Sequence, residues 1–432
     1  MLSILQGMLE SRISSSVIMT PRIIAQDMID ILPNEVWNKD TTFLDPVCKS
    51  GIFLKLIYTR LMIELADEIA SEEDRREHIL TNQLYGICES KFLGAVSQRT
   101  VYNKMVDSGS GNIRYIEGIN NIIKRGYEKY KNTIDKEFKR NMRFDVVIGN
   151  PPYNKGMDLD FVNKGFEIAN KYVVMITPAK WQTAADDQRV ASNTIDYTEF
   201  RKQLVPHMSK VVFYPDALDV FDIGIREGIT YYLLDKSNHN ECTVINRCKL
   251  QKHFNSERKR SLINRETLHN CGNDIIEHIK NYDRFRFKIN SSGKYLVYTC
   301  GDITIGGRSG SEYFLLNSSG SSVYLGNSYI VDTSVKDIKL RLPAVNKLSF
   351  RSDTKAECES FVSWLNTKFT RFFIAINLSS RGGVITDDYF RFVPAPPSGK
   401  FDHIYTDEEL YKAFNLPQKY IDVIEAVIKE RT

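Results

Sequence analysis

The chain has 432 residues and a formal net charge of +4 at pH 7, with 42% hydrophobic and 26% charged residues. These proportions are ordinary for a globular protein and exclude a mainly disordered or fibrous chain. No apolar run approaches the roughly 18 residues that a membrane-spanning helix needs, so we expect a cytoplasmic protein with no membrane partner. The seven cysteines include no CxxC pair, so we expect neither a disulfide framework nor a metal site.

Helical and strand patterns alternate through the first half of the chain. Thr20 and Pro21 are typical of an N-cap followed by proline in the first turn, and apolar residues then recur at helical spacing until Pro33. A strand at residues 42–44 leads through a tight loop into a helix from about residue 52. Further strands are expected in LYGICES, NIRYIEG, FDVVIGN and YVVMITP, with helices between them. This order predicts an α/β fold with a doubly wound, mostly parallel sheet, closed by an antiparallel pair from KVVFYPDALDVF and EGITYYLLD.

From about residue 238 the chain loses this alternation. Clusters rich in glycine and serine, such as NSSGKY, GGRSGSEY and SSRGG, separate short strand-like runs. The tail is helical, with Thr406 as an N-cap and an amphipathic helix after Pro417. We therefore expect two domains, at residues 1–237 and 238–432, the second of mixed α and β structure.

The stretch FDVVIGNPPY ends a buried strand in a corner that is rich in hydrogen-bond acceptors and poor in donors. Asn150 lies where the strand ends, and Pro151 and Pro152 offer carbonyl groups without N–H groups. A flat amine with two hydrogens, such as N6 of adenine, could donate to the Asn150 side-chain oxygen and the Pro151 carbonyl while Tyr153 stacks on the ring. The alternative is a proline-rich turn that only ends a strand.

A second corner lies at the end of the first strand. Asp45 stands at the carboxyl end of that strand, and Gly51 lies at the mouth of the next helix, where backbone N–H groups face a ligand. Alone this pattern is weak. Its combination with NPPY, about a hundred residues later at the end of another strand, favours a cofactor site beside a catalytic corner.

Together these motifs resemble the gamma class of N6-adenine DNA methyltransferases of restriction-modification systems, which belong to the class I enzymes that use S-adenosylmethionine. VIMTPRIIAQDM is similar to their motif X, FLDPVCKSGIFL to motif I and NPPY to motif IV, in that order. The resemblance is strong through residue 235 and looser beyond it. It implies a seven-stranded methyltransferase sheet at residues 1–237 and a target-recognition domain at residues 238–432.

The resemblance also implies roles for individual residues. S-adenosylmethionine would be bound by Thr20, Pro21, Asp45, Pro46, Ser50, Gly51, Glu89, Asn112 and Asn150. The catalytic corner would consist of Asn150, Pro151, Pro152 and Tyr153. The target-base pocket would be formed by Tyr153, Tyr231 and Tyr232, with Phe221 as a further candidate for its rim. Three features depart from the family pattern. Lys49 stands where a glycine is common, and Glu89 lies three residues after the strand glycine instead of two. GNIRYIEG offers Asn112 or Glu117 where the family usually has an aspartate beside the cofactor adenine.

Double-stranded DNA is the expected partner, with a separate restriction endonuclease subunit as a possible second one. The basic tract after residue 245 contributes Lys252, Arg258, Lys259 and Arg260 as candidate phosphate contacts, and two glycine-rich loops contribute Arg308 and Arg381. A second basic tract at residues 122–143 is better explained as a solvated helix face. Two rival functions remain open: methylation of a protein glutamine side chain, and an inactive methyltransferase fold that binds DNA, which the departures at Lys49 and Glu89 favour.

Overall fold

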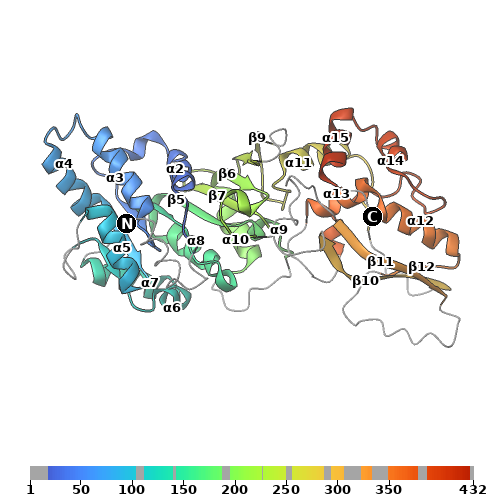
Figure 1. Ribbon diagram of the computed structural model, residues 1–432, viewed down its shortest axis with the longest axis horizontal. Helices are drawn as coiled ribbons and strands as arrows, with labels where there is room; N and C mark the ends of the chain where they lie inside the picture. The colour runs from blue at the N-terminus through green and yellow to red at the C-terminus, as the bar shows by residue number, and fades with distance from the viewer. Residues whose placement is uncertain are drawn as a thin grey trace.

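The computed structural model describes residues 18–103, 111–139, 143–186, 195–225, 227–249, 255–286, 293–305, 323–332, 349–377 and 387–428. Two bodies lie side by side along the long axis of the molecule, and Figure 1 shows the larger, N-terminal one on the left. No helix in these ranges is both long enough and apolar enough to cross a membrane.

The larger body is built on one sheet in the order β3-β2-β1-β4-β5-β7-β6-β8-β9. Neighbouring strands from β3 to β5 run parallel, whereas β7 is antiparallel to both β5 and β6. The mostly parallel α/β fold and its antiparallel closing pair are therefore confirmed. The strands are β1 (Phe43–Asp45), β2 (Leu84–Cys88), β3 (Ile113–Tyr115), β4 (Phe144–Gly149), β5 (Ala169–Pro178), β6 (Met208–Tyr214), β7 (Ile229–Asp235), β8 (Cys242–Asn246) and β9 (Ser256–Arg260).

The sheet has nine strands and not the expected seven. Strand β8 lies beyond residue 238 and pairs in parallel with β6, and β9 pairs antiparallel with β8. Cys242 and Val244 of β8 are buried in the same core as the preceding strands, and so is Leu268. The chain thus continues the first sheet across the boundary expected at residue 238, because β8 still has apolar side chains to bury against it.

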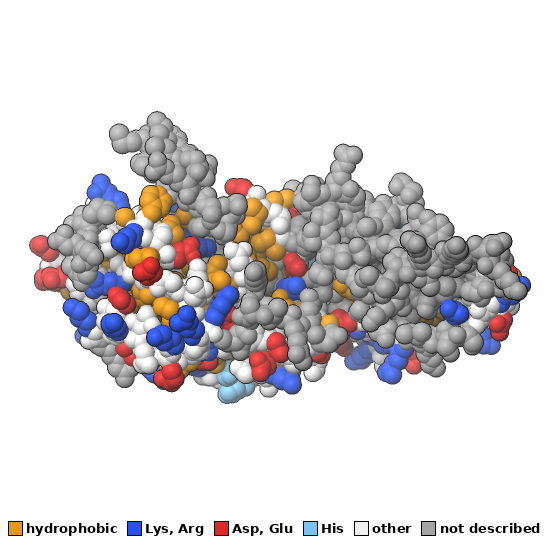
Figure 2. Space-filling model, turned by 90° about the horizontal axis from the view of Figure 1, so that it is seen from below, with side chains coloured by type: hydrophobic (Ala, Val, Ile, Leu, Met, Phe, Trp, Pro, Cys, Tyr) orange, Lys and Arg blue, Asp and Glu red, His pale blue; other side chains and the backbone are white. Residues whose placement is uncertain are grey.

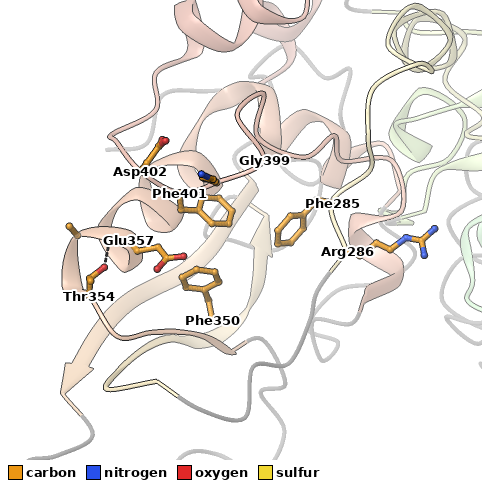
Figure 3. A pocket seen from close by; sticks show the side chains of 10 residues that line it. Phe285, Arg286, Phe350, Thr354, Glu357, Gly399, Phe401 and Asp402 are labelled. Atoms are coloured by element: carbon orange, nitrogen blue, oxygen red, sulfur yellow. Dashed lines mark hydrogen bonds between the residues drawn. The ribbon is translucent and has the colours of Figure 1, made fainter.

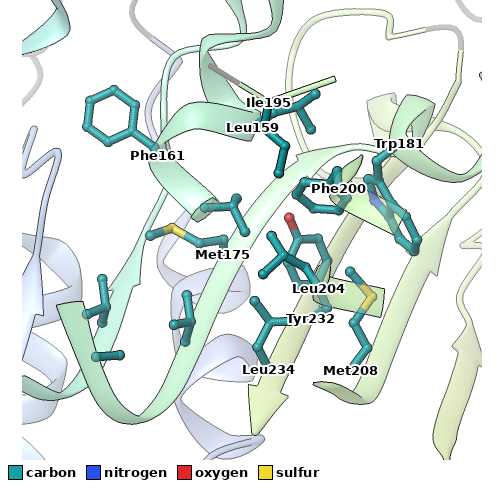
Figure 4. Close-up of a cluster of buried hydrophobic side chains, with 14 of the residues drawn as sticks. Leu159, Phe161, Met175, Trp181, Ile195, Phe200, Leu204, Met208, Tyr232 and Leu234 are labelled. Carbon is teal, nitrogen blue, oxygen red and sulfur yellow. The ribbon is translucent and has the colours of Figure 1, made fainter. Parts of the chain in front are cut away.

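Helices cover both faces of the sheet, so its central strands are buried on both sides. On β4, Val147 faces one core cluster while Val146 and Ile148 face the other. Figure 4 shows part of the first cluster, where Leu159 and Phe200 approach β5 and β7 from two different helices. The helices are α2 (Arg22–Asp30), α3 (Ile52–Glu64), α4 (Glu72–His78), α5 (Lys91–Tyr102), α6 (Ile119–Ile122), α7 (Tyr127–Phe138), α8 (Met157–Ile168), α9 (Lys180–Thr183) and α10 (Tyr197–Leu204).

The second body contains a three-stranded antiparallel sheet in the order β11-β10-β12, packed on helices. An aromatic core that includes Phe361, Trp364 and Phe372 joins them. The elements are α11 (Asn270–His278), β10 (Tyr295–Ile305), β11 (Val323–Asp332), β12 (Ser349–Ser352), α12 (Lys355–Asn366), α13 (Lys368–Ala375), α14 (Asp407–Ala413) and α15 (Gln418–Val427). As expected, Thr406 caps α14 by accepting a hydrogen bond from the backbone N–H of Glu409.

A cavity of about 590 Å³ opens on the second body. The rings of Phe285, Phe350 and Phe401 line it, with Arg286 and Lys400 also among its lining residues. Figure 3 shows the three rings gathered between β12, α12 and the loop that carries Gly399. This cavity lies away from the corners that the sequence singles out, which are both on the larger body.

Candidate cofactor pocket and catalytic corner

The two corners identified in the sequence lie next to each other at the carboxyl edge of the sheet. Strands β1 and β4 are parallel neighbours, with Phe43 opposite Val146 and Leu44 opposite Val147. The residues that follow them therefore emerge side by side, as expected for a ligand site in an α/β sheet. A small pocket forms there, lined by Thr20, Asp45, Val47, Lys49, Ser50, Gly51, Ile52, Phe53 and Asn150. Five of the residues that the sequence assigned to the cofactor are thus brought together.

Asp45 ends β1 with its side chain 2% exposed. Its Oδ1 accepts a hydrogen bond of 3.1 Å from the backbone N–H of Val47. Burial raises the pKa of the Asp45 carboxyl to about 7, although the Val47 N–H and the charge of Lys49 act in the opposite direction. A side-chain hydrogen bond from Cys48 acts in the same direction as the Val47 N–H. A buried carboxylate has up to four acceptor sites, so it can accept further hydrogen bonds and is suited to a cationic ligand group.

The loop after β1 is held close to the neighbouring strand. The Cys48 N–H donates to the Ile87 carbonyl of β2 at 2.7 Å, and Ser97 Oγ donates to the Lys49 carbonyl at 3.0 Å. Gly51 has a φ of +79°, and a Cβ added there would lie 3.1 Å from the Ser97 carbonyl oxygen. Glycine is therefore required at the N-terminus of α3, whose first N–H groups face the pocket.

Lys49 is the unexpected member of this pocket. Its side chain is buried, with 8% of the residue exposed, and its Nζ donates a hydrogen bond of 2.9 Å to the Ile18 carbonyl. Burial lowers the pKa of the Lys49 ammonium to about 8, while the charges of Glu89 and Asp45 partly offset this effect. The side chain does not point to solvent, as a lysine in place of a loop glycine easily could.

Asn150 follows β4 and is 2% exposed. Its Nδ2 donates to Thr20 Oγ1 at 3.0 Å and to the Ile18 carbonyl at 3.3 Å. Its Oδ1 is buried without a hydrogen-bond donor among the described residues. Thr20 does not cap α2 with its side chain, because Pro21 is the N-cap and the Thr20 hydroxyl is occupied by Asn150. The Asn150 side-chain amide is thus held by its nitrogen, and among the described residues nothing donates a hydrogen bond to its oxygen.

Tyr153 lies next to the corner with its hydroxyl donating to the Ile176 carbonyl of β5 at 3.3 Å. Its ring centroid is 6.5 Å from that of Phe221, and the two planes are inclined by 59°. Phe221 was a lesser candidate for the pocket rim in the sequence, and it is the aromatic residue that the structure places beside Tyr153. Phe221 lies in the loop after β6, so this loop comes close to the NPPY corner.

Tyr231 and Tyr232 lie in the middle of β7, with 3% and 0% of each residue exposed. The Tyr231 ring packs on Tyr214, and the Tyr232 ring packs on Trp181 at 5.8 Å. The structure thus gives both rings core contacts and does not bring them to the pocket that Asp45 and Asn150 line.

Glu89 and Asn112 lie at opposite edges of the sheet, because Glu89 follows β2 whereas Asn112 precedes the parallel strand β3. Glu89 follows β2, and its Oε2 accepts a 2.9 Å hydrogen bond from Asn120 Nδ2. Asn112 precedes β3, and its side-chain amide donates to the Leu80 and Thr81 carbonyls, which gives it a structural role. Asn120 was not singled out in the sequence. Its buried Oδ1 has no hydrogen-bond donor among the described residues. In the sequence, the position of an amide shortly after β3 was the one feature that could have marked it as a candidate.

The candidate DNA contacts that the structure describes lie on β9. Arg258 pairs with Asp274 at 3.3 Å and Lys259 with Glu241 at 2.6 Å, and both basic side chains are more than half exposed. Arg260 is turned inward and donates to Asn270 Oδ1 and to the Thr267 carbonyl. Lys252, Arg308 and Arg381 lie outside the described residues.

The other basic tract forms α6, α7 and the turn between them. Figure 2 shows Lys and Arg side chains on the underside of the larger body, where Figure 1 places these helices. Exposed basic members of the tract are Arg125, Lys129, Lys136, Lys139 and Arg143, whereas Lys131 is buried against Asp135. This pattern agrees with the solvated helix face that the sequence favoured.

Comparison with known proteins relates this sheet to methylases. Residues 82–213, which include the NPPY corner, match the model of the Eco57I restriction-modification methylase family. A protein of Mycoplasma pneumoniae described as an uncharacterized adenine-specific methylase is 28% identical over 303 residues, which cover 54% of this chain and 70% of that protein.

Solved structures give weaker likenesses. A modification subunit of a putative type I restriction enzyme from Vibrio vulnificus is 13% identical with a TM-score of 0.38, over 57% of this chain and 50% of that one. A nuclease-deletion mutant of the Type ISP restriction-modification enzyme LlaGI is also 13% identical, with a TM-score of 0.44 over 70% of this chain and 30% of that one. The chain thus spans half or less of these structures. Residues 82–213 are therefore the part of the chain that is similar to the Eco57I restriction-modification methylase family.

Proposed function

We propose that the chain transfers a methyl group from S-adenosylmethionine to N6 of an adenine that is rotated out of double-stranded DNA. It would act as the modification component of a restriction-modification system. The observation that carries this proposal is the buried Asn150 Oδ1, which lacks a donor among the described residues. Buried polar atoms in folded proteins are almost always paired, so an orphaned acceptor at a ligand site indicates the place of a ligand donor. The adenine-specific relative supports the choice of base.

The residues at the pocket fit the amino-acid end of S-adenosylmethionine. Asp45 is a buried carboxyl for the ligand's ammonium, Gly51 allows close approach at the N-terminus of α3, and Thr20 lies beside Asn150. Glu89 stands at the end of the next strand, where it would bind the ribose hydroxyls. The pocket itself has only about 10 Å³, the space of a single water molecule. Side chains that line it must therefore move when the cofactor binds.

The cofactor supplies an activated methyl group that already carries positive charge on sulfur. Asn150 Oδ1 and the Pro151 carbonyl would accept the two hydrogens of the target amine, which favours a tetrahedral nitrogen with its lone pair directed at the methyl group. Tyr153 would stack on the base, which is worth about 1–3 kcal/mol and offsets part of the cost of rotating it out of the duplex. Pro152 keeps the corner rigid. Once methylated, the nitrogen would carry a positive charge and would release one proton to water, so no strong general base is needed.

The DNA would contact both bodies of the molecule. Arg258 and Lys259 lie on the outer edge strand, close in sequence to the second body, and their exposed ion pairs are weak enough to exchange for phosphates. We assign target recognition to the second body, including the loops of Arg308 and Arg381, and the restriction activity to a separate endonuclease subunit. A DNA substrate places the chain in the cytoplasm of the bacterial, archaeal or phage-infected cell that produces it.

The decisive experiment compares methyl transfer to DNA by the wild type, Asn150→Ala and Asn170→Ala. Asn170 is an exposed amide at the start of β5, so its replacement is a matched control for loss of an amide. We expect Asn150→Ala to lose transfer by at least a hundredfold, because a positioned acceptor is removed, while cofactor binding stays nearly intact. Asn170→Ala should retain full transfer. Retained turnover in Asn150→Ala would refute the assignment of the catalytic corner.

Two measurements separate the rival functions. Calorimetry with S-adenosylmethionine tests the inactive DNA-binding fold, since a chain that does not bind the cofactor cannot be the enzyme. Sequencing of DNA from a methylation-free host that expresses the chain tests the substrate. Methylated adenine in a fixed sequence context supports the proposal, whereas unmodified DNA together with methylated glutamine in host proteins favours the glutamine methyltransferase.

A further inference from the structure

Lys49 is a buried cation inside the pocket, and the described residues offer its ammonium few hydrogen-bond acceptors and no ion pair. An ammonium can donate three hydrogen bonds, and the bond to the Ile18 carbonyl is the one that the described residues provide. No carboxylate in the described ranges lies within ion-pair distance of its Nζ, although Asp45 and Glu89 act on its pKa from farther away. Burying a charge in this way costs free energy unless a partner is supplied, and a ligand can supply it.

The charge pattern of the pocket indicates which ligand group that partner is. The amino-acid end of the proposed cofactor carries one ammonium and one carboxylate. Asp45 ends β1 and Lys49 lies four residues later in the following loop. Both line the pocket, and their charges are opposite. If Asp45 binds the ammonium, Lys49 is the pocket residue of the right sign for the carboxylate. Lys49 also already reaches across the pocket to the Ile18 carbonyl, so it can approach an acceptor in that space.

We propose that Lys49 binds the carboxylate of the cofactor's amino-acid portion, and that in doing so it gives up its hydrogen bond to the Ile18 carbonyl. This inference rests on the proposed use of S-adenosylmethionine. It gives Lys49 a role in ligand specificity. The presence of Lys49 in place of glycine is therefore no argument against cofactor binding. It also explains the small volume of the pocket. In the free protein the Lys49 side chain occupies space that it leaves when the ligand binds.

The exchange has a consequence for the catalytic corner. The Ile18 carbonyl accepts hydrogen bonds from both Lys49 Nζ and Asn150 Nδ2. When Lys49 turns to the ligand, Asn150 becomes the only described donor to that carbonyl. The orientation of the Asn150 amide is then set by Ile18 and Thr20 alone, with its Oδ1 still free to accept from the target amine.

The test is calorimetry at pH 7.5 with two ligands, S-adenosylhomocysteine, which has the carboxylate, and 5′-methylthioadenosine, which lacks the whole amino-acid portion. The proteins are the full-length wild type, Lys49→Met and Lys55→Met. Lys55 lies one turn into α3 and does not line the pocket, so its replacement removes a cation nearby. We expect Lys49→Met to weaken S-adenosylhomocysteine binding about tenfold or more and to change 5′-methylthioadenosine binding less than about twofold. Lys55→Met should change neither.

Each other outcome is informative. Equal weakening of both ligands by Lys49→Met would mean that the lysine supports the pocket and does not contact the carboxylate, and tighter binding of both would mean that it only blocks the pocket. Either result, or no change at all, overturns the inference while leaving the proposed function intact. If the wild type binds neither ligand, the proposed function itself fails. Thermal unfolding of Lys49→Met checks the fold, which should be kept because no ion pair is broken.

Discussion

The ionisation of Asp45 should make cofactor affinity depend on pH in the mildly acidic range. The pKa of this carboxyl is raised to about 7 by burial, so in the free protein it is half protonated near neutrality. A ligand ammonium binds the ionised form, and below pH 7 binding must first remove a proton. The affinity of the wild type for S-adenosylhomocysteine should therefore fall about tenfold for each pH unit below 7, which is about 1.4 kcal/mol per unit. It should level off between pH 7 and about pH 8, where the Lys49 ammonium begins to lose its proton.

Asp45→Asn provides the comparison, because it keeps the size of the side chain and removes the charge. At pH 7.5 we expect it to bind S-adenosylhomocysteine about ten to a hundred times more weakly than the wild type, since a hydrogen bond to a charged group contributes about 1.5–3 kcal/mol. Its affinity should not change between pH 5.5 and 7.5. Calorimetry across that range measures both curves. A flat wild-type curve, or a slope retained in Asp45→Asn, would refute the role of this carboxyl.

Three further predictions concern other parts of the molecule. Phe221→Ala should lower methyl transfer about tenfold and leave S-adenosylhomocysteine affinity unchanged, because an aromatic contact at the base is lost; a change confined to cofactor affinity would contradict this. Gly228→Ala should lower the free energy of unfolding by about 2–4 kcal/mol in urea titrations, since φ is +74° and a Cβ would lie 2.5 Å from a carbonyl oxygen of β6. Gly118→Ala, with φ +67° and no atom within 4 Å, should cost only about half as much. Replacing Arg258 and Lys259 by serine should weaken DNA binding to all sequences and reduce the slope of log affinity against log salt by about 2, and an unchanged slope would exclude phosphate contacts there.

Local sequence patterns predicted the first five strands well, because each is a short apolar run followed by a turn signal and a helix. The NPPY corner was equally predictable as a rigid turn, since two prolines after an asparagine restrict the backbone whatever surrounds them, and its catalytic role stays a prediction. In these cases the information is contained within about ten residues of chain, and tertiary contacts only reinforce it.

Contacts between segments far apart in the sequence were harder to predict. The extension of the sheet by β8 and β9 depends on β6 offering a free edge, which no local pattern reveals. The inward orientation of the Lys49 side chain depends on a carbonyl 31 residues earlier in the chain, so the sequence around Lys49 does not reveal it. Tyr231 shows a different limit of sequence analysis. The sequence of a strand does not reveal whether an aromatic side chain faces a ligand or the protein interior.

The course of the chain through β8 and β9 limits how this protein can be divided. A fragment that stops at residue 237 would leave β6 with an unpaired edge and remove Cys242, Val244 and Leu268 from the apolar interior they share with the preceding strands. Such a fragment should aggregate, because exposed strand edges pair with other chains. Any attempt to exchange the second body for that of another methylase should therefore place the junction after residue 268, so that the transplanted portion begins where the nine-stranded sheet is complete.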